Sequence, residues 1–192
     1  MPNLYIIAGC NGAGKTTASL TVLPEVLNCF EFVNADSIAA GLSPLNPDSV
    51  AFEAGRIMLN RIRHLLNNEV DFAFETTLST KSYVLLIKEA KAKGYQITLL
   101  CFWLNSPELA INRVANRVSQ GGHNIPVDVI IRRYYRGLYN LINLYTGVVD
   151  VLMVSDNAGL SPKLIASSLS GKVSVIQKEF WHIILKQASH GK

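Results

Sequence analysis

The stretch Gly9-Cys10-Asn11-Gly12-Ala13-Gly14-Lys15-Thr16-Thr17 directly follows an apolar run at residues 4–8, and it decides the fold of this chain. It fits the pattern G-x-x-x-x-G-K-[ST], in which glycines let backbone N–H groups turn around a phosphate. A strand-like run precedes the pattern, and a helix is expected at residues 15–22. The sequence therefore predicts a phosphate-binding loop at a strand-to-helix turn.

Each part of this loop has an expected role. Lys15 reaches the outer phosphates of the nucleotide and takes part in catalysis, while the Thr16 hydroxyl holds Mg²⁺. The alternative is a glycine-rich turn without a ligand, and the flanking strand and helix favour the phosphate-binding interpretation. The residues expected to bind the ATP cofactor are Gly9, Asn11, Gly12, Ala13, Gly14, Lys15, Thr16 and Thr17.

The composition indicates a single domain spanning residues 1–192, because 49% hydrophobic residues are ample for a core at this length. A net charge of +4 is mild and dispersed, so it does not select a partner class, and we do not expect nucleic acid as the partner. No apolar run approaches the roughly 18 residues that a membrane span needs. Cys10, Cys29 and Cys101 lack metal or disulfide spacing, so we expect a cytoplasmic protein.

Short apolar runs alternate with stretches of helical period along the chain. The expected strands cover residues 4–8, 30–35, 70–74, 96–104 and 148–154. The expected helices after the first cover residues 48–67, 81–93, 107–119 and 127–145. A further helix is expected after Ser161, then a short apolar run at residues 173–176, and then a last helix that contains Trp181. This alternation predicts a three-layer α/β fold with a parallel sheet of about five strands.

Residues 120–126 break the helical period with a Gly-Gly pair and join two helices that carry arginines. We therefore expect a small helical lid around residues 113–136. Arg113, Arg117, Arg132, Arg133 and Arg136 bracket this segment, and the sequence does not decide which of them contact phosphate. Charge that develops during phosphoryl transfer needs such groups, and we expect Arg117 and Arg132 to supply them.

Two acidic residues end expected strands, at the sheet edge where ligands of open parallel sheets gather. Asp36 is expected to act as the general base that accepts a proton from a substrate hydroxyl, and its alternative role is to cap the helix that follows. Glu75 ends the third strand in the manner of a carboxylate that helps to hold Mg²⁺, and its alternative is a simple turn residue.

Taken together, these motifs resemble those of the zeta-toxin-like small kinases, which have a P-loop kinase fold. The resemblance spans residues 4 to 157 and rests on motifs in matching order, namely the phosphate loop, Asn34-Ala35-Asp36, Phe74-Glu75-Thr76-Thr77-Leu78-Ser79, Arg113-Val114 through Arg117-Val118, Gly121-Gly122-His123 and Arg132-Arg133-Tyr134.

The resemblance implies that Lys15 and Thr16 handle phosphates and Mg²⁺, that Asp36 activates the acceptor hydroxyl, and that Glu75 supports substrate or metal. Toxin members use ATP to phosphorylate a UDP-N-acetyl amino sugar, and an antitoxin protein is an expected partner. They carry an arginine shortly after the catalytic Asp, where this chain reads Ser37-Ile38-Ala39-Ala40, so the acceptor stays open.

The sequence therefore predicts an ATP- and Mg²⁺-dependent phosphotransferase that acts on a hydroxyl of a small metabolite, with a UDP-N-acetyl amino sugar as one acceptor to test. A nucleotide-binding ATPase or a regulator without small-molecule kinase activity is the alternative. An ABC-type ATPase would need an L-S-G-G-Q signature, and Ser119-Gln120-Gly121-Gly122-His123 does not provide it.

Overall fold

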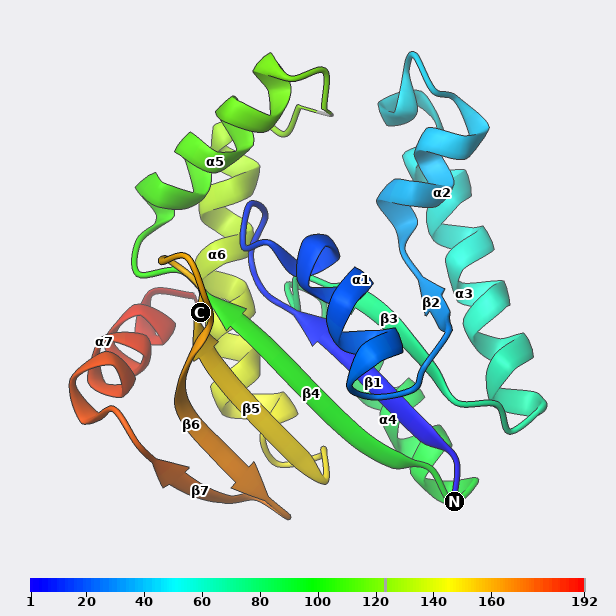
Figure 1. The fold of residues 1–192 in the computed structure, drawn as a ribbon, viewed down its shortest axis with the longest axis vertical. Coiled ribbons are helices and arrows are strands. Elements are labelled where there is room, and N and C mark those ends of the chain that lie inside the picture. The colour runs from blue at the N-terminus through cyan, green and yellow to red at the C-terminus, as the bar shows by residue number, and fades with distance from the viewer. Residues whose placement is uncertain (123, 192) are drawn as a thin grey trace.

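The computed structural model describes residues 1–122 and 124–191, and in them one seven-stranded sheet forms the centre of the molecule (Figure 1). The strand order is β2-β3-β1-β4-β5-β6-β7. The strands are β1 (Asn3–Ala8), β2 (Glu31–Val33), β3 (Phe72–Thr76), β4 (Gln96–Trp103), β5 (Val151–Asp156), β6 (Lys163–Leu169) and β7 (Lys172–Val175). The strands β1 to β5 pair in parallel, whereas β6 and β7 pair antiparallel.

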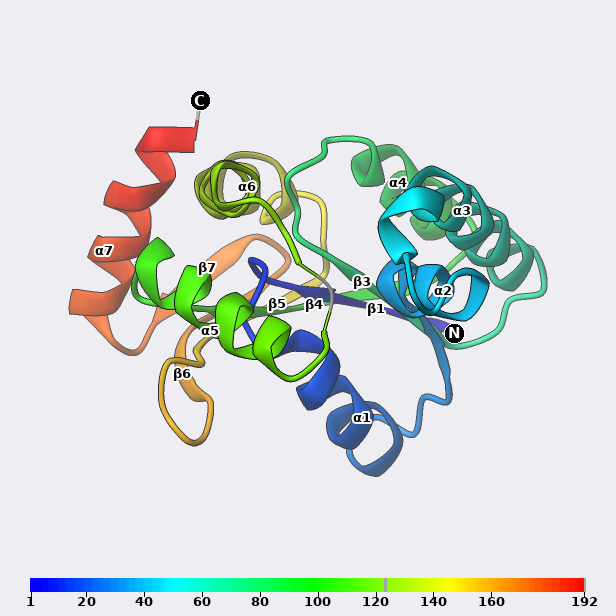
Figure 2. The same cartoon turned by 90° about the horizontal axis from the view of Figure 1, so that it is seen from above.

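Helices lie on both sides of the sheet, with α3, α4 and α6 on one face and α1 on the other (Figure 2). The predicted three-layer α/β fold is therefore confirmed. The helices are α1 (Lys15–Glu25), α2 (Ala35–Leu42), α3 (Ala51–Asn67), α4 (Tyr83–Ala92), α5 (Pro107–Ser119), α6 (Val127–Asn140) and α7 (Lys178–Ala188). Among the described helices, none is long and apolar enough to cross a bilayer.

The central strands form because their side chains are apolar on both faces. All of β1 from Leu4 to Ala8 is buried, and Phe72, Ala73 and Phe74 of β3 are also buried. Such continuous apolar runs suit a parallel sheet that is covered by helices on both sides. The parallel arrangement brings the carboxyl ends of β1, β2 and β3 to one edge, where the sequence places its polar motifs.

The last two strands correct the prediction of about five strands. A helix was expected after Ser161, but residues 163–169 form β6, which pairs with the exposed edge of β5. Ser170 and Gly171 both have positive φ, at 48° and 80°, which is the geometry of a two-residue hairpin turn into β7. Because the hairpin turn and the pairing with β5 both favour a strand, residues 163–169 form β6 and not the expected helix.

The segment between α5 and α6 begins with a defined helix end. Gly121 has φ of 84°, its N–H donates to the carbonyl of Val118, and the N–H of Gly122 donates to the carbonyl of Arg117. This pair of bonds is the Schellman arrangement, which glycine favours because it adopts positive φ without strain. His123 lies outside the described residues, and the lid motion of residues 113–136 stays a prediction.

Candidate functional site

The phosphate loop passes close to neighbouring backbone at two glycines. A Cβ on Gly9, which has φ of 148°, would collide with the carbonyl oxygen of Phe102. A Cβ on Gly12, which has φ of 78°, would lie 2.9 Å from the carbonyl oxygen of Ala110. Both positions therefore require glycine, for space and for backbone conformation. The loop conformation that the motif predicts is the one found between β1 and α1.

Lys15, Thr16 and Glu75 meet at the end of this loop. The Lys15 ammonium donates to the carbonyl of Cys10 at 3.0 Å and lies 3.4 Å from Glu75 Oε1. The Thr16 hydroxyl donates to Glu75 Oε2 at 2.7 Å. The side chains of Lys15 and Glu75 are only 7% and 11% exposed, so water screens their attraction poorly. The structure thus brings together three residues that the sequence predicts from two separate motifs.

Asn34 was not among the predicted site residues, yet it connects both acidic residues. Its Nδ2 donates to Glu75 Oε2 at 2.8 Å, which fixes the orientation of that carboxylate. Its Oδ1 accepts from the backbone N–H groups of Asp36 and Ser37 at 2.8 and 3.1 Å, and so caps α2. Asparagine is a favoured capping residue, and this signal was available in the sequence immediately before the helix.

Asp36 lies in the first turn of α2 and is exposed. Its alternative role as the helix cap is excluded by geometry, because Asn34 occupies that position. A carboxylate in the first turn interacts favourably with the positive end of the helix dipole. The Asp36 side chain is therefore available to a ligand at the carboxyl edge of the sheet.

Two polar cavities meet at this edge. One, of about 160 Å³, follows the phosphate loop and includes Gly12, Gly14 and Thr16 in its wall. The other, of about 220 Å³, lies over β3 and α2. The residues that line both are Asn11, Lys15, Asp36 and Glu75. This shared wall is where a group could pass from a ligand in one cavity to a ligand in the other.

The five arginines near the predicted lid occupy different environments. Arg117 lines the phosphate-loop cavity. Arg113 lines it as well, but its guanidinium donates to the carbonyls of Asn157 and Ala158 at 2.9 Å each, so it also holds the loop between β5 and β6. Asn157 in turn donates to the carbonyl of Ala13 at 2.7 Å. Arg113 therefore supports the phosphate loop through a chain of hydrogen bonds.

Arg133 and not Arg132 lines the larger of the two polar cavities. The Arg133 Nη1 donates to Asn11 Oδ1 of the phosphate loop at 3.4 Å, whereas Arg132 and Arg136 are exposed. The helical period of the sequence indicates this difference between Arg133 and Arg132. Arg133 lies three residues after Ile130 and four before Gly137, which are both buried, so it is on the same side of α6 as these residues.

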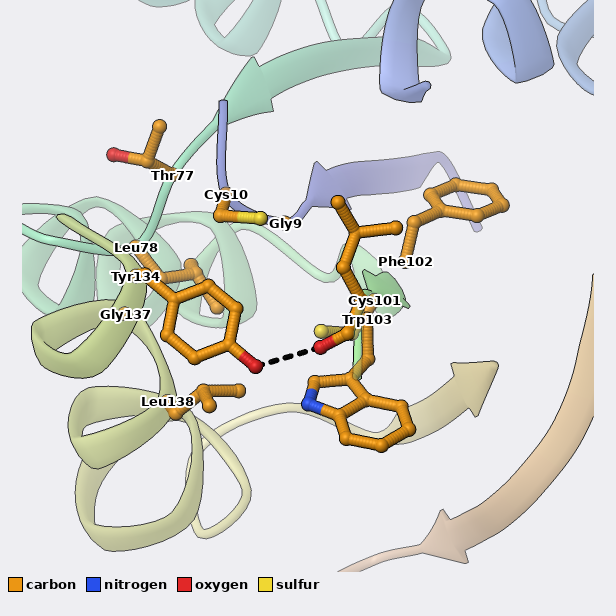
Figure 3. A pocket seen from close by; sticks show the side chains of 11 residues that line it. Gly9, Cys10, Thr77, Leu78, Cys101, Phe102, Trp103, Tyr134, Gly137 and Leu138 are labelled. Atoms are coloured by element: carbon orange, nitrogen blue, oxygen red, sulfur yellow. Dashed lines mark hydrogen bonds between the residues drawn. The ribbon is translucent and has the colours of Figure 1, made fainter. Parts of the chain in front are cut away.

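A small cavity beside the phosphate loop is lined mainly by apolar side chains, and Tyr134 donates to the carbonyl of Leu104 at 2.6 Å across it (Figure 3). Its volume of about 20 Å³ can hold one water at most. Burial raises the pKa of Cys10, which lines it, to about 11. The Cys10 thiol thus stays protonated near neutral pH, and it is a packing residue rather than a nucleophile.

The oxygen donors at the site suit Mg²⁺. Thr16 supplies a hydroxyl and Glu75 a carboxylate, and the two oxygens are already 2.7 Å apart. Mg²⁺ prefers oxygen ligands and is usually held by one or two side chains together with substrate phosphates. No group of three or more His, Cys, Asp or Glu side chains that could hold a metal occurs within residues 1–122 and 124–191. The residues present therefore fit a metal that is held jointly with a nucleotide.

The fold and this site define a P-loop protein of the kinase-like class. More specifically, the chain belongs to the zeta toxin family, because the model of that family matches residues 1–162. The resemblance inferred from the motifs is thus confirmed. An uncharacterized protein of Haemophilus influenzae is 31% identical over 126 residues, which cover 66% of this chain and 88% of that protein.

Solved structures share the fold at low sequence identity. Two structures of the AvrRxo1-ORF1:AvrRxo1-ORF2 complex, with sulphate ions and with ATP, match 96% of this chain with TM-scores of 0.76 and 0.74 and identities of 17% and 18%. This chain spans 63% of the length of the matched chain. A structure of the PezAT toxin-antitoxin system of Streptococcus pneumoniae covers 99% of this chain and 87% of its own, with TM-score 0.67 and 17% identity.

Proposed function

We propose that this protein transfers the γ-phosphoryl group of ATP to a hydroxyl of a small acceptor. One observation carries the proposal, which is that the phosphate-loop cavity and the larger cavity share a wall made of Asn11, Lys15, Asp36 and Glu75. A hydrolase needs one ligand cavity, whereas a transferase needs two that meet. Family membership and the ATP-containing structure of a protein with the same fold support the choice of ATP as the donor.

In the proposed reaction the acceptor hydroxyl oxygen attacks the γ-phosphorus, and the bond between that phosphorus and the leaving oxygen of ADP breaks. Asp36 takes the hydroxyl proton and later releases it to solvent. Lys15 contacts the outer phosphates, while Arg117 and Arg133 offset the charge on the transferring oxygens. From the sequence we expected Arg132 to have this role. Arg132 lies on the same helix as Arg133, but it is exposed and does not line the larger cavity.

Mg²⁺ bound with the nucleotide would be held by Thr16 and Glu75, and it would neutralise negative charge on the phosphates. Asn34 keeps the Glu75 carboxylate in position for that role. We assign Asn34 as a positioning residue, since it contacts the metal ligand and the helix of Asp36. Closure of residues 113–136 over the site would exclude water that could otherwise accept the phosphoryl group.

The larger cavity, which we assign to the acceptor, is lined by two cationic side chains, Lys15 and Arg133, and two carboxylates, Asp36 and Glu75, and its other polar groups are neutral. Thr76, Thr77, Ser79 and Thr80 contribute hydroxyls, and Tyr83 and Met58 contribute apolar surface. These groups suit a hydroxyl-rich molecule such as a sugar, and the sugar of a UDP-N-acetyl amino sugar belongs to this class. A screen with γ-labelled ATP over sugar nucleotides, free sugars and nucleosides identifies the acceptor.

The test of the proposal uses two variants. Lys15→Ala should abolish binding of ATP with Mg²⁺, whereas Asp36→Asn should retain binding and lose transfer. Unchanged transfer in Asp36→Asn would remove the base role from Asp36. ATP hydrolysis by the wild type that no acceptor in the screen redirects would favour the ATPase alternative.

A toxin role with an antitoxin partner is the second part of the proposal, supported by family membership and by the toxin-antitoxin system that shares the fold. The measurement is growth of cells in which expression of the chain is induced. Growth arrest by the wild type but not by Lys15→Ala links toxicity to the nucleotide site. Equal growth with both chains counts against a toxin role.

A further inference from the structure

The side chain of Gln187 on α7 joins two elements that border the phosphate loop, the end of β4 and α6. Its Oε1 accepts from Trp103 Nε1 at 3.0 Å and lies 3.0 Å from the hydroxyl of Tyr134. Its Nε2 donates to the carbonyl of Asn105 at 2.8 Å. We propose that Gln187 is a positioning residue, which fixes the orientation of α6 and so holds Arg133 beside the phosphate loop. This role rests on the proposed function, in which Arg133 offsets charge on the transferring oxygens.

The contacts of Gln187 are made to buried groups. Trp103 and Tyr134 are each only 2% exposed, and both line the small cavity beside the phosphate loop (Figure 3). Burial raises the pKa of the Tyr134 hydroxyl above its ordinary value, so this group keeps its hydrogen and donates to the carbonyl of Leu104 at 2.6 Å. Because a buried N–H without a partner is costly, the indole of Trp103 favours the arrangement in which Gln187 accepts from it.

The end of β4 supports the phosphate loop. A Cβ on Gly9 of the loop would collide with the carbonyl oxygen of Phe102. The carbonyl of Trp103 accepts from the backbone N–H of Asn157 at 2.8 Å, and the Asn157 side chain donates to the carbonyl of Ala13 at 2.7 Å. The strand therefore contacts the loop at its start and supports its middle through one intermediate residue. An element that is tied to this end of β4 is placed relative to the loop as well.

The next turns of α6 face the phosphate loop and the larger polar cavity. Arg133 donates to Asn11 Oδ1 of the loop at 3.4 Å and lines the larger cavity. One turn further on, Gly137 packs so tightly that a Cβ there would collide with the carbonyl oxygen of Thr77, which also lines that cavity. Adjacent residues of an α-helix point about 100° apart around its axis, so a rotation that moves Tyr134 also turns Arg133. The contact at Tyr134 therefore sets the direction of Arg133.

Apolar and backbone contacts dock α7 independently of Gln187. Ile184 and Ala188 of α7 are buried. The short helix that follows α7 packs against α6 so closely that a Cβ on Gly191 would collide with the carbonyl oxygen of Tyr135. A substitution at Gln187 thus removes polar contacts from a helix that stays docked, and it perturbs the orientation of α6 rather than the presence of α7.

The first measurement reads the position of Arg133 from the side-chain amide NMR signals of Asn11, its hydrogen-bond partner. Gln187→Met keeps the length of the side chain and removes its polar atoms, so we expect it to shift these signals in the same direction as Arg133→Ala does. Gln187→Glu keeps the accepting oxygen and loses only the donor to Asn105, so it should give a smaller shift. The matched control, Lys186→Met, changes an exposed neighbour on α7 and should leave the signals unchanged.

Unchanged Asn11 signals in Gln187→Met, or an equal shift in Lys186→Met, overturns the inference. If Gln187→Met does not fold, Gln187→Glu decides the question, because wild-type Asn11 signals in that variant contradict the positioning role.

The second measurement tests whether this position matters for phosphoryl transfer. ADP with Mg²⁺ and aluminium fluoride mimics the transferring group, whereas ADP with Mg²⁺ alone lacks it. Gln187→Met should weaken binding of the first about tenfold and of the second by less than about twofold, because only the first presents the oxygens that Arg133 contacts. In the Arg133→Ala background Gln187→Met should have no further effect, since both residues act through one group. Additive losses would show that Gln187 acts elsewhere and would overturn the inference.

The two readouts separate the positioning role from the proposed function. An Asn11 shift in Gln187→Met, without loss of aluminium fluoride binding in Arg133→Ala, would refute the role proposed for Arg133 in transfer and support its positioning by Gln187. Loss of that binding in Arg133→Ala, with neither a shift nor a loss in Gln187→Met, would support the proposed function and overturn the positioning role.

Discussion

Replacing Asn34 separates the two tasks that its side chain performs. Asn34→Ala removes the cap of α2 and the hydrogen bond to Glu75. Loss of a cap costs about 1 kcal/mol. Loss of a hydrogen bond to a charged group costs about 2 kcal/mol. Asn34→Ser keeps a capping oxygen and loses only the amide donor, so its free energy of unfolding should fall by about 2 kcal/mol and that of Asn34→Ala by about 3 kcal/mol.

Thermal unfolding followed by circular dichroism measures these differences. Each kcal/mol corresponds to about 2–4 °C of Tm in a protein of this size, so we expect a fall of about 6–12 °C for Asn34→Ala. Asn60→Ala, at an exposed position of α3, should change stability by less than about 0.5 kcal/mol. Equal Tm values for Asn34→Ala and Asn34→Ser would refute the capping role. A wild-type Tm for Asn34→Ser would refute the contribution of the Glu75 bond.

Three further predictions concern the same site. Arg133→Ala should lower the rate of transfer about 100-fold or more, and more than Arg132→Ala, in a γ-labelled ATP assay; the reverse order would make Arg132 the phosphate-stabilising residue. Gly9→Ala should destabilise the protein by about 3 kcal/mol or more in urea titration, whereas Gly41→Ala should be neutral or stabilising, since a Cβ there meets nothing within 4 Å. Because the pKa of Cys10 is raised to about 11, alkylation by iodoacetamide at pH 8 should be much slower than that of a peptide thiol and should accelerate as the pH approaches that value; rapid labelling at pH 8, read by mass spectrometry, would contradict the packing role.

The centre of the fold was predictable because its signals are local. The phosphate loop, the buried strands on either side of it and the helix at Pro107–Ser119 follow from glycine placement and apolar runs. The C-terminal strands were missed because β6 pairs with the free edge of β5 and β7 pairs with β6, and the residues of these strands do not themselves show that an edge is available. Strand formation at an edge is decided by the neighbouring strand as much as by the residues themselves.

In the site, too, some residues were predictable from the sequence and others were not. Lys15, Thr16 and Glu75 were predictable because each lies within one residue of the start of α1 or the end of β3, at the same sheet edge. The role of Asn34 depends on a hydrogen bond to a residue 41 positions away, which no spacing rule reveals. The choice between Arg132 and Arg133 depends on how α6 is rotated about its axis, and that rotation follows from its buried residues.

The C-terminal helix α7 lies outside the part of the chain that the family model matches, which ends at residue 162. Its Gln187 nevertheless accepts from Trp103 Nε1 at 3.0 Å, donates to the carbonyl of Asn105 at 2.8 Å and lies 3.0 Å from the hydroxyl of Tyr134. Tyr134 is the neighbour of Arg133 on α6. Displacing α7 would therefore break all three contacts and alter the support of Tyr134, whose neighbour Arg133 we propose as a phosphate-stabilising residue. A molecule bound to α7 would act on that residue without entering either polar cavity.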